Sequence, residues 1–129
     1  MTNGYLLDSQ VLMWLGSNQK RIGPSSMRLI RHADLYYSTV SVAELGFKSR
    51  FGKLQFGPQD IEDWRNFNIS ELPFSQSAAL MFADFSGHNV PDPMDRQIMA
   101  TAAANGLGLI TSDQRILELG LTWVLDATT

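Results

Sequence analysis

Four acidic residues of the chain stand where an apolar, strand-like run or a turn leads into a helix: Asp8, Glu44, Asp95 and Asp113. Asp8 and Asp113 come at the ends of apolar runs. Glu44 lies early in a helix, and Asp95 lies just inside the helix that Pro93 opens. In a chain of alternating strands and helices the sheet is usually parallel, so we expect these positions to gather at one edge of it. Carboxylates brought together repel one another, and a bound divalent cation is the usual reason to tolerate that repulsion.

Each of these acids also has a structural explanation. Asp8 and Asp113 would cap the helices that follow them. Ser41 and Glu44 fit a capping box, in which the glutamate returns to the backbone amide of the capping residue. Asp95 lies in the first turn of its helix, where the helix dipole favours an anion. Taken one at a time, the four residues are explained by helix capping.

Considered together, the four acids favour a metal site. Asp95 shares a helix face with Ile98, Met99 and Ala102, because residues three and four apart are neighbours, so it stands at the top of a buried stripe. A cap needs only one polar oxygen, which Ser or Thr would supply. All four positions instead carry a full negative charge, as hard cations such as Mg²⁺ and Mn²⁺ require.

Apolar runs and turn residues divide the rest of the chain into alternating elements. We expect strands at residues 5–7, 35–38, 69–72, 107–111 and 123–125. We expect helices at residues 9–15, from Pro24 onward, and at 40–51, 58–66, 75–85, 93–105 and 114–119. This order predicts a single α/β domain over residues 1–129, a three-layer α/β/α sandwich with a mainly parallel central sheet.

The composition is that of a globular protein, with 44% hydrophobic residues, 18% charged residues and no cysteine. No apolar run approaches the roughly 20 residues of a membrane span, and the first residues lack the features of a signal peptide. We therefore expect a cytoplasmic protein that does not enter a membrane. The net charge of −3 argues mildly against nucleic-acid binding. Cations bound to the four carboxylates would offset that charge, so it leaves a nucleic-acid partner open.

Four segments of the chain carry a resemblance to a known family. They read YLLDSQVLMWL at 5–15, STVSVAELGFK at 38–48 with FGKL at 51–54, HNVPDPMDRQIMATA at 88–102 and LGLITSDQRI at 107–116. In this order and spacing the chain resembles the PIN-domain ribonucleases, specifically the VapC-like toxins of bacterial toxin–antitoxin pairs. The resemblance implies a PIN-like fold and an endoribonuclease that hydrolyses RNA phosphodiesters with Mg²⁺ or Mn²⁺.

The resemblance also assigns roles to residues and partners. Asp8, Glu44, Asp95 and Asp113 match the family's catalytic, metal-binding acids. A cognate antitoxin protein and a homodimer are implied as partners, beside the RNA substrate. Ser9 stands where the family usually has Thr, which keeps a hydroxyl near the metal. Gln10 and Ala43 stand where His and Trp are common, and the first of these changes removes any role for a histidine there.

Further residues are candidates for supporting the metal or contacting substrate: Ser9, Asp92, Arg96 and Thr111. Asp92 precedes Pro93 and has the signature of a helix cap, and it is also the main rival of Asp95 for the third metal position. Arg96, Lys48 and Arg115 would steer phosphates or form surface salt bridges. His88 is a loop candidate for substrate contact.

Other function classes fit the sequence less well. A receiver-like signalling domain needs an Asp at the end of a central strand and a Lys at the end of a later one. The run 35–38 ends without an Asp, and Asp113 stands where that Lys would be. A phosphatase of the dehalogenase type needs Asp-x-Asp after the first strand, and position 10 is Gln. A catalytically silent PIN binding module remains open as an alternative.

Overall fold

The computed structural model describes residues 4–85 and 90–129, and in these ranges five parallel strands form one sheet. The strands are β1 (Gly4–Leu7), β2 (Asp34–Ser38), β3 (Ile69–Leu72), β4 (Gly108–Thr111) and β5 (Val124–Asp126). Their order across the sheet is β3-β2-β1-β4-β5, so β1 lies in the centre. His88 and residues 1–3 lie outside the described residues.

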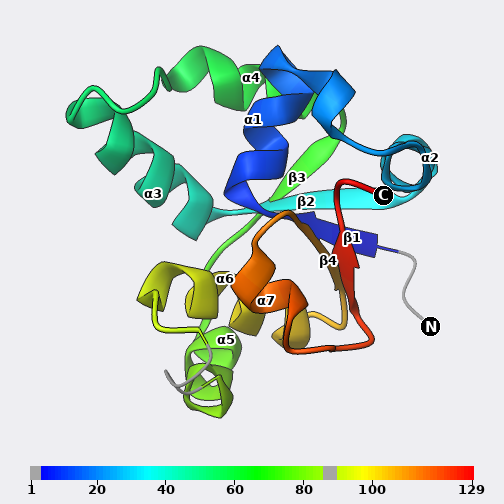
Figure 1. The fold of residues 1–129 in the computed structure, drawn as a ribbon. Helices are drawn as coiled ribbons and strands as arrows, with labels where there is room; N and C mark the ends of the chain where they lie inside the picture. The colour runs from blue at the N-terminus through cyan, green and yellow to red at the C-terminus, as the bar shows by residue number, and fades with distance from the viewer. Residues whose placement is uncertain (1–3, 86–89) are drawn as a thin grey trace.

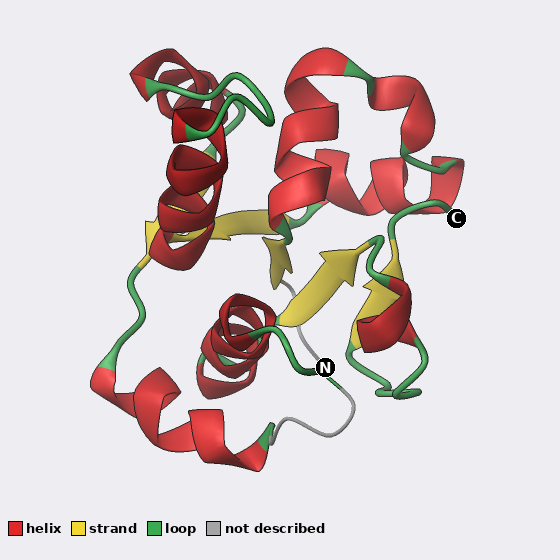
Figure 2. Ribbon diagram, turned by 60° about the vertical axis from the view of Figure 1, so that its left-hand side comes forward, coloured by secondary structure: helices red, strands yellow, loops and turns green. Residues whose placement is uncertain are grey.

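Helices cover both faces of this sheet, as Figure 1 and Figure 2 show. The α-helices of the described ranges are α1 (Ser9–Ser17), α2 (Pro24–His32), α3 (Thr39–Arg50), α4 (Pro58–Asn66), α5 (Gln76–Met81), α6 (Pro93–Ala104) and α7 (Gln114–Leu117). Two 3₁₀ turns, η1 (Gln19–Arg21) and η2 (Phe82–Asp84), complete the set. The predicted α/β/α sandwich with a mainly parallel sheet is confirmed. Among the described residues, no helix is both long and apolar enough to cross a membrane.

The sheet separates two hydrophobic cores, because successive side chains of a strand point to opposite faces. Leu7 of β1 packs with Leu12 of α1 and Trp64 of α4 on one face. Leu6 packs with Ile98 of α6 on the other. All of these side chains are nearly or fully buried. Both faces of the central strand are therefore apolar, as expected for a parallel sheet covered on both sides.

Several predicted helix ends differ from the observed ones, by one to four residues. The helix expected at 40–51 begins at Thr39, because Ser38 is its cap and the Ser38 hydroxyl accepts a 3.0 Å hydrogen bond from the Val40 amide. The predicted capping box of Ser41 and Glu44 is therefore wrong, and both residues lie inside the helix. The helix expected at 75–85 ends at Met81 and continues as the 3₁₀ turn η2.

Candidate active site

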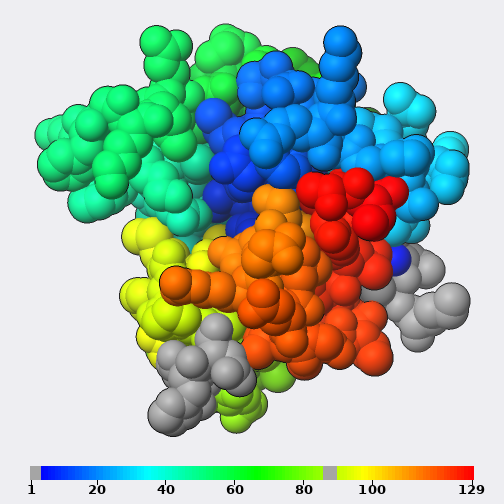
Figure 3. All heavy atoms as spheres, in the orientation of Figure 1, coloured from blue at the N-terminus to red at the C-terminus, as the bar shows by residue number. Residues whose placement is uncertain are grey.

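The edge of the sheet where the strands end brings together the helix starts that carry the predicted acids. In the space-filling view the start of α1 (dark blue) lies between α3 (teal) and α7 (orange), with α6 (yellow) below (Figure 3). A hollow of about 500 Å³ opens here, and all four predicted acids line it: Asp8, Glu44, Asp95 and Asp113. The expectation that they meet at one edge is confirmed.

Asp8 is held rigidly at the centre of this edge. It directly follows β1, is only 6% exposed, and its Oδ1 accepts a 2.8 Å hydrogen bond from the Ser9 amide as the cap of α1. Its Oδ2 accepts a 2.6 Å hydrogen bond from the Thr111 hydroxyl at the end of the neighbouring strand β4. Burial raises the pKa of Asp8 above its ordinary value, the two hydrogen bonds lower it, and Glu44 and Asp113 raise it further.

Thr111 also connects Asp8 to Asp113. The Thr111 Oγ1 atom accepts a 3.0 Å hydrogen bond from the Asp113 amide. Asp113 in turn caps α7, since its Oδ1 accepts hydrogen bonds from the amides of Arg115 at 2.8 Å and Ile116 at 3.3 Å. Capping and site formation are therefore compatible at this residue, because both amides use the same carboxylate oxygen.

Glu44 reaches the hollow from α3 and is oriented by hydroxyl groups. Its side chain is buried, and Ser9 Oγ lies 2.6 Å from Glu44 Oε1 and 2.8 Å from Ser41 Oγ. Ser9 has one hydroxyl proton, and an ionised carboxylate is the stronger acceptor. We therefore infer that the Ser9 hydroxyl donates its hydrogen bond to Glu44. The second contact is then a hydrogen bond that the Ser41 hydroxyl donates to Ser9 Oγ. On the other side Lys48 Nζ donates to Glu44 Oε2 at 3.2 Å.

Asp95 carries a large electrostatic cost at the site. It lies half-buried in the first turn of α6. Burial, followed by the charges of Asp8, Asp92, Asp113 and Glu44, raises the pKa of Asp95 to about 8. A carboxyl group in this position is mostly protonated at neutral pH unless a positive charge is brought beside it.

The tightest acidic group includes a residue outside the predicted quartet. Among the described residues, Glu44, Asp92 and Asp95 each offer one carboxylate oxygen, and these oxygens lie within 4.8 Å of one another. Asp92 is exposed and also caps α6, because its Oδ1 accepts a 2.8 Å hydrogen bond from the Met94 amide. Asp92 therefore joins Asp95 at the site instead of replacing it. Carboxylate oxygens in this density are the donor set that a hard divalent cation takes, so the residues fit such an ion.

The predicted phosphate-steering arginines are not among the described residues that line the hollow. The Arg96 guanidinium lies over the Phe82 ring, 4.9 Å from its centroid, and its buried Nε atom has no hydrogen-bond partner within the described ranges. Two residues that the sequence did not suggest as site residues do take part in the site. Ser41 belongs to the hydroxyl chain described above, and Lys53 lines the hollow.

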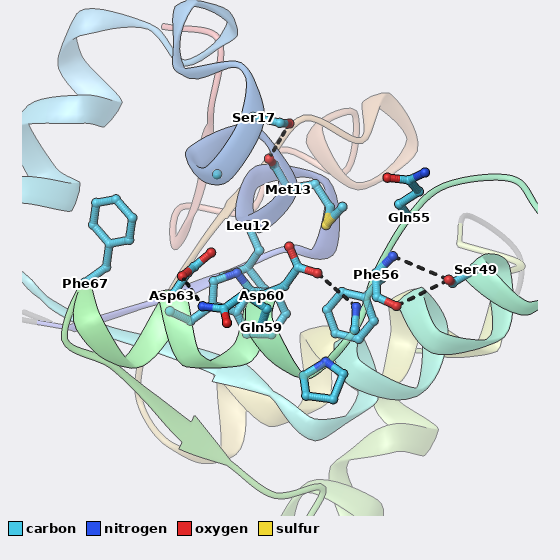
Figure 4. A pocket seen from close by; sticks show the side chains of 14 residues that line it. Leu12, Met13, Ser17, Ser49, Gln55, Phe56, Gln59, Asp60, Asp63 and Phe67 are labelled. Atoms are coloured by element: carbon cyan, nitrogen blue, oxygen red, sulfur yellow. Dashed lines mark hydrogen bonds between the residues drawn. The ribbon is translucent and has the colours of Figure 1, made fainter.

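A larger hollow, of about 790 Å³, lies between α1 and α4 (Figure 4). It contains two acids of α4, Asp60 and Asp63. Asp60 Oδ2 accepts a 2.9 Å hydrogen bond from the Gly57 amide, and Asp63 Oδ1 accepts one of 3.0 Å from the Gln59 side chain. Both hydrogen bonds stabilise the first turns of α4. The smaller hollow, with its crowded carboxylates, is therefore the candidate active site.

Comparison with known proteins decides the family. A family model described as the PIN domain matches residues 5–120. The chain belongs to the PIN-domain family. Among curated proteins, this PIN protein is 31% identical over 119 residues to Ribonuclease VapC22 of Mycobacterium tuberculosis (strain ATCC 25618 / H37Rv), covering 86% of this chain and 88% of that one. The resemblance to VapC-like members is thus confirmed, and the receiver-like and phosphatase alternatives are excluded.

Solved structures share the fold of this PIN protein. A toxin–antitoxin complex from Klebsiella pneumoniae matches with a TM-score of 0.69 and 17% identity, over 95% of this chain and 97% of that one. The VapBC-1 structure from nontypeable Haemophilus influenzae matches with a TM-score of 0.66 and 24% identity, over 98% and 99% of the two chains. At these identities the likeness establishes the α/β fold.

Proposed function

We propose that this PIN protein is a metal-dependent endoribonuclease that acts as the toxin of a toxin–antitoxin pair. The observation that carries the proposal is the crowding of carboxylates around Asp95, whose pKa is raised to about 8 by burial and by its acidic neighbours. Such a cluster is costly without a cation. Family membership and the relative named a ribonuclease support RNA as the substrate.

In this proposal Asp8, Glu44, Asp95 and Asp113 face a Mg²⁺ or Mn²⁺ ion, with Asp92 completing the tight acidic group. When bound, the cation would activate a water molecule for attack on the phosphodiester and neutralise the charge that develops on the phosphate. The protein's own part is orientation. Thr111 fixes the Asp8 carboxylate through its 2.6 Å hydrogen bond, and the Ser41–Ser9 chain fixes Glu44. Supporting partners of this kind typically change metal affinity or activity by about 10–100-fold.

Partners and setting are part of the same proposal. One solved structure with this fold is a toxin–antitoxin complex and another is VapBC-1, which supports a cognate antitoxin as the protein partner. A homodimer, a single domain over residues 1–129 and a cytoplasmic location complete the proposal. The PIN-domain match over residues 5–120 supports the single domain.

Cleavage of mixed cellular RNA by the pure protein, with Mn²⁺, Mg²⁺ or EDTA, tests the proposal. We expect cleavage that requires the metal and falls by roughly 100-fold or more in Asp8→Asn, since loss of a ligand should cost at least as much as loss of a supporting residue. Expression of the wild type, but not of Asp8→Asn, should arrest growth. Asp63→Asn is the matched control, because it removes an acid from the other hollow and should leave cleavage unchanged.

Asparagine at position 8 has the shape of aspartate. Its Oδ1 can still accept the Ser9 hydrogen bond, and its Nδ2 can donate to the Thr111 hydroxyl oxygen, so Asp8→Asn should fold. Metal-independent cleavage, or equal cleavage by the wild type and Asp8→Asn, would contradict the nuclease mechanism. A folded wild type that cleaves no RNA and takes up no Mn²⁺ in calorimetry would point to the catalytically silent binding module.

A further inference from the structure

Two lysines line the acidic hollow beside the four carboxylates. Among the described residues of its lining, the cationic ones are Lys48, in the last turn of α3, and Lys53, just beyond the end of that helix. Both are exposed. The hollow therefore has a strongly acidic floor and a basic side formed by one end of α3.

The end of α3 fixes where Lys53 lies relative to Lys48. Gly52 has a φ of +72°, the left-handed conformation that glycine adopts most readily. The Gly52 amide donates to the Ser49 carbonyl at 3.1 Å, and the Lys53 amide donates to the Lys48 carbonyl at 3.1 Å. This pair of hydrogen bonds is a Schellman motif. It turns the chain back on the helix, so that Lys53 is tied through its backbone to Lys48 and both side chains line the same hollow.

Lys48 forms an ion pair with Glu44, and its ammonium group can still make a further contact. Its Nζ lies 3.2 Å from Glu44 Oε2, and its side chain is 45% exposed. An ammonium group has three donors, so Lys48 can contact Glu44 and an incoming anion together. Lys53 makes no ion pair with any other described residue, although it borders a hollow lined by four acids.

An RNA strand needs such charges at this place. A cation held by the carboxylates would neutralise the phosphate that is cut, but the next phosphates along the strand would still face the acids. Contacts from lysine to phosphate supply affinity that does not depend on sequence. We propose that Lys48 and Lys53 form a clamp for the phosphates flanking the one that is cut. This inference rests on the proposed function, because it takes RNA as the substrate.

Salt-dependent binding of a fluorescein-labelled, mixed-sequence single-stranded RNA 12-mer tests the clamp. All variants carry Asp8→Asn and are measured in Mg²⁺, so that binding is observed without cleavage. We expect Lys48→Ala and Lys53→Ala each to weaken binding roughly tenfold at low salt, and each to reduce the slope of log Kd against log salt by about 0.7–1, as for one lost phosphate contact. Lys48→Arg and Lys53→Arg should restore both values.

Lys20→Ala is the matched control, since Lys20 is an exposed lysine of η1 that does not line the hollow. Lys53→Ala separates phosphate binding from an indirect effect on Glu44, because Lys53 forms no ion pair with that residue. The clamp is overturned if Lys48→Ala and Lys53→Ala have the same slope of log Kd against log salt as Lys20→Ala. It is also overturned if the Asp8→Asn background shows no measurable RNA binding.

The nuclease assay on proteins with Asp8 intact keeps the two proposals apart. If the wild type cleaves RNA but the slopes do not change, the clamp alone is wrong. If the slopes fall as expected while the wild type cleaves nothing, the two lysines bind RNA phosphates, but the nuclease proposal is wrong and so is the placing of these phosphates beside a cut one. With cleavage present, Lys53→Ala should raise KM with little change in kcat, because flanking phosphates contribute equally to binding before and during the reaction.

Discussion

At the residue scale, Asp95 makes the site sensitive to pH. The raised pKa of about 8 means that the folded, metal-free protein holds a proton on Asp95 that the unfolded chain, with an ordinary value of 3.8, releases. Between these two values the folded state binds more protons than the unfolded state. The contribution of Asp95 to stability therefore falls as pH rises through this range, and the full penalty is present above pH 8.

Replacing this carboxyl with a neutral amide should therefore stabilise the metal-free protein. We expect Asp95→Asn to melt at a higher temperature than the wild type in EDTA, with a small difference at pH 5 and the largest at pH 8–9, because the wild type loses the Asp95 contribution to stability as pH rises and the variant does not. Thermal melts across this range measure the effect, at roughly 4 °C per kcal/mol for a domain of this size. A constant difference between Asp95→Asn and the wild type across this pH range would contradict the assignment.

The sequence predicted the identity of the acids better than their geometry. The spacing of Asp8 and Asp113 to their strands was sufficient to place both at one edge, because strand direction in a parallel sheet is uniform. It could not show that Asp92 would lie within reach of Glu44 and Asp95, since this depends on how α6 is oriented against α3. It also could not show that Ser41 would contact Ser9, because those hydroxyls come from elements 32 residues apart.

At the element scale, the start of α3 shows where local signals compete. Ser38 and Ser41 are both plausible caps, and Glu44 three residues after Ser41 favours the second. The structure uses Ser38, because β2 ends there and the helix can begin at once. Glu44 consequently lies in the second turn of α3 and lines the carboxylate hollow. The helix start at Thr39 therefore explains both why the predicted Ser41 cap is wrong and why Glu44 reaches the site.

The other end of α3 provides a prediction about its turn. Gly52→Ala should destabilise the protein by about 1–2 kcal/mol, because a side chain is unfavourable at a φ of +72°. Gly46→Ala in the same helix is the matched control. No heavy atom lies within 4 Å of a Cβ at position 46, so alanine should instead stabilise the helix by about 0.5–1 kcal/mol. Chemical denaturation measures both changes, and equal signs for the two variants would contradict the described helix end.

At the scale of the whole molecule, the C-terminal segment is packed onto the start of α2. The Gly23 amide donates to the Ala127 carbonyl at 2.8 Å, and the Ser25 amide donates to the Thr129 carbonyl at 2.9 Å. The Ser26 hydroxyl donates to the Asp126 carbonyl at 2.9 Å. These hydrogen bonds attach β5, the edge strand, to a helix that covers the sheet.

Glycine at position 23 is required by this packing. A Cβ there would meet the backbone of Thr128 and Thr129 inside van der Waals contact, and backbone cannot move aside as a flexible side chain can. We expect Gly23→Ala to lower the free energy of unfolding by about 1–3 kcal/mol, as overpacking does. Urea denaturation measures it, with Gly16→Ala as a control, because no heavy atom lies within 4 Å of a Cβ at position 16. An unchanged stability of Gly23→Ala would show that the C-terminal segment is not held there.

The global fold could be predicted from the sequence because the strand, helix and capping signals agreed with one another. Apolar runs of strand length alternated with helical periodicity, and Asp92 with Pro93 marked a helix start that the structure keeps. The break after Met81 was not readable, since neither Met81 nor Phe82 is a helix breaker. The packing of the C-terminal segment on Gly23 was also hidden, because it joins residues 100 or more positions apart, as the Ser26–Asp126 bond does.

The central position of β1 has a consequence for how the protein is made. β1 leaves the ribosome before β4, which it needs as a neighbour, and Asp8 receives its hydrogen bond from Thr111, 103 residues later in the chain. At roughly 5–20 residues per second, synthesis of the intervening segment takes about 5–20 s. Throughout that interval the nascent chain carries an incomplete site. The ribosome therefore synthesises the chain at least as far as Thr111 before the site of a protein able to cut RNA can form.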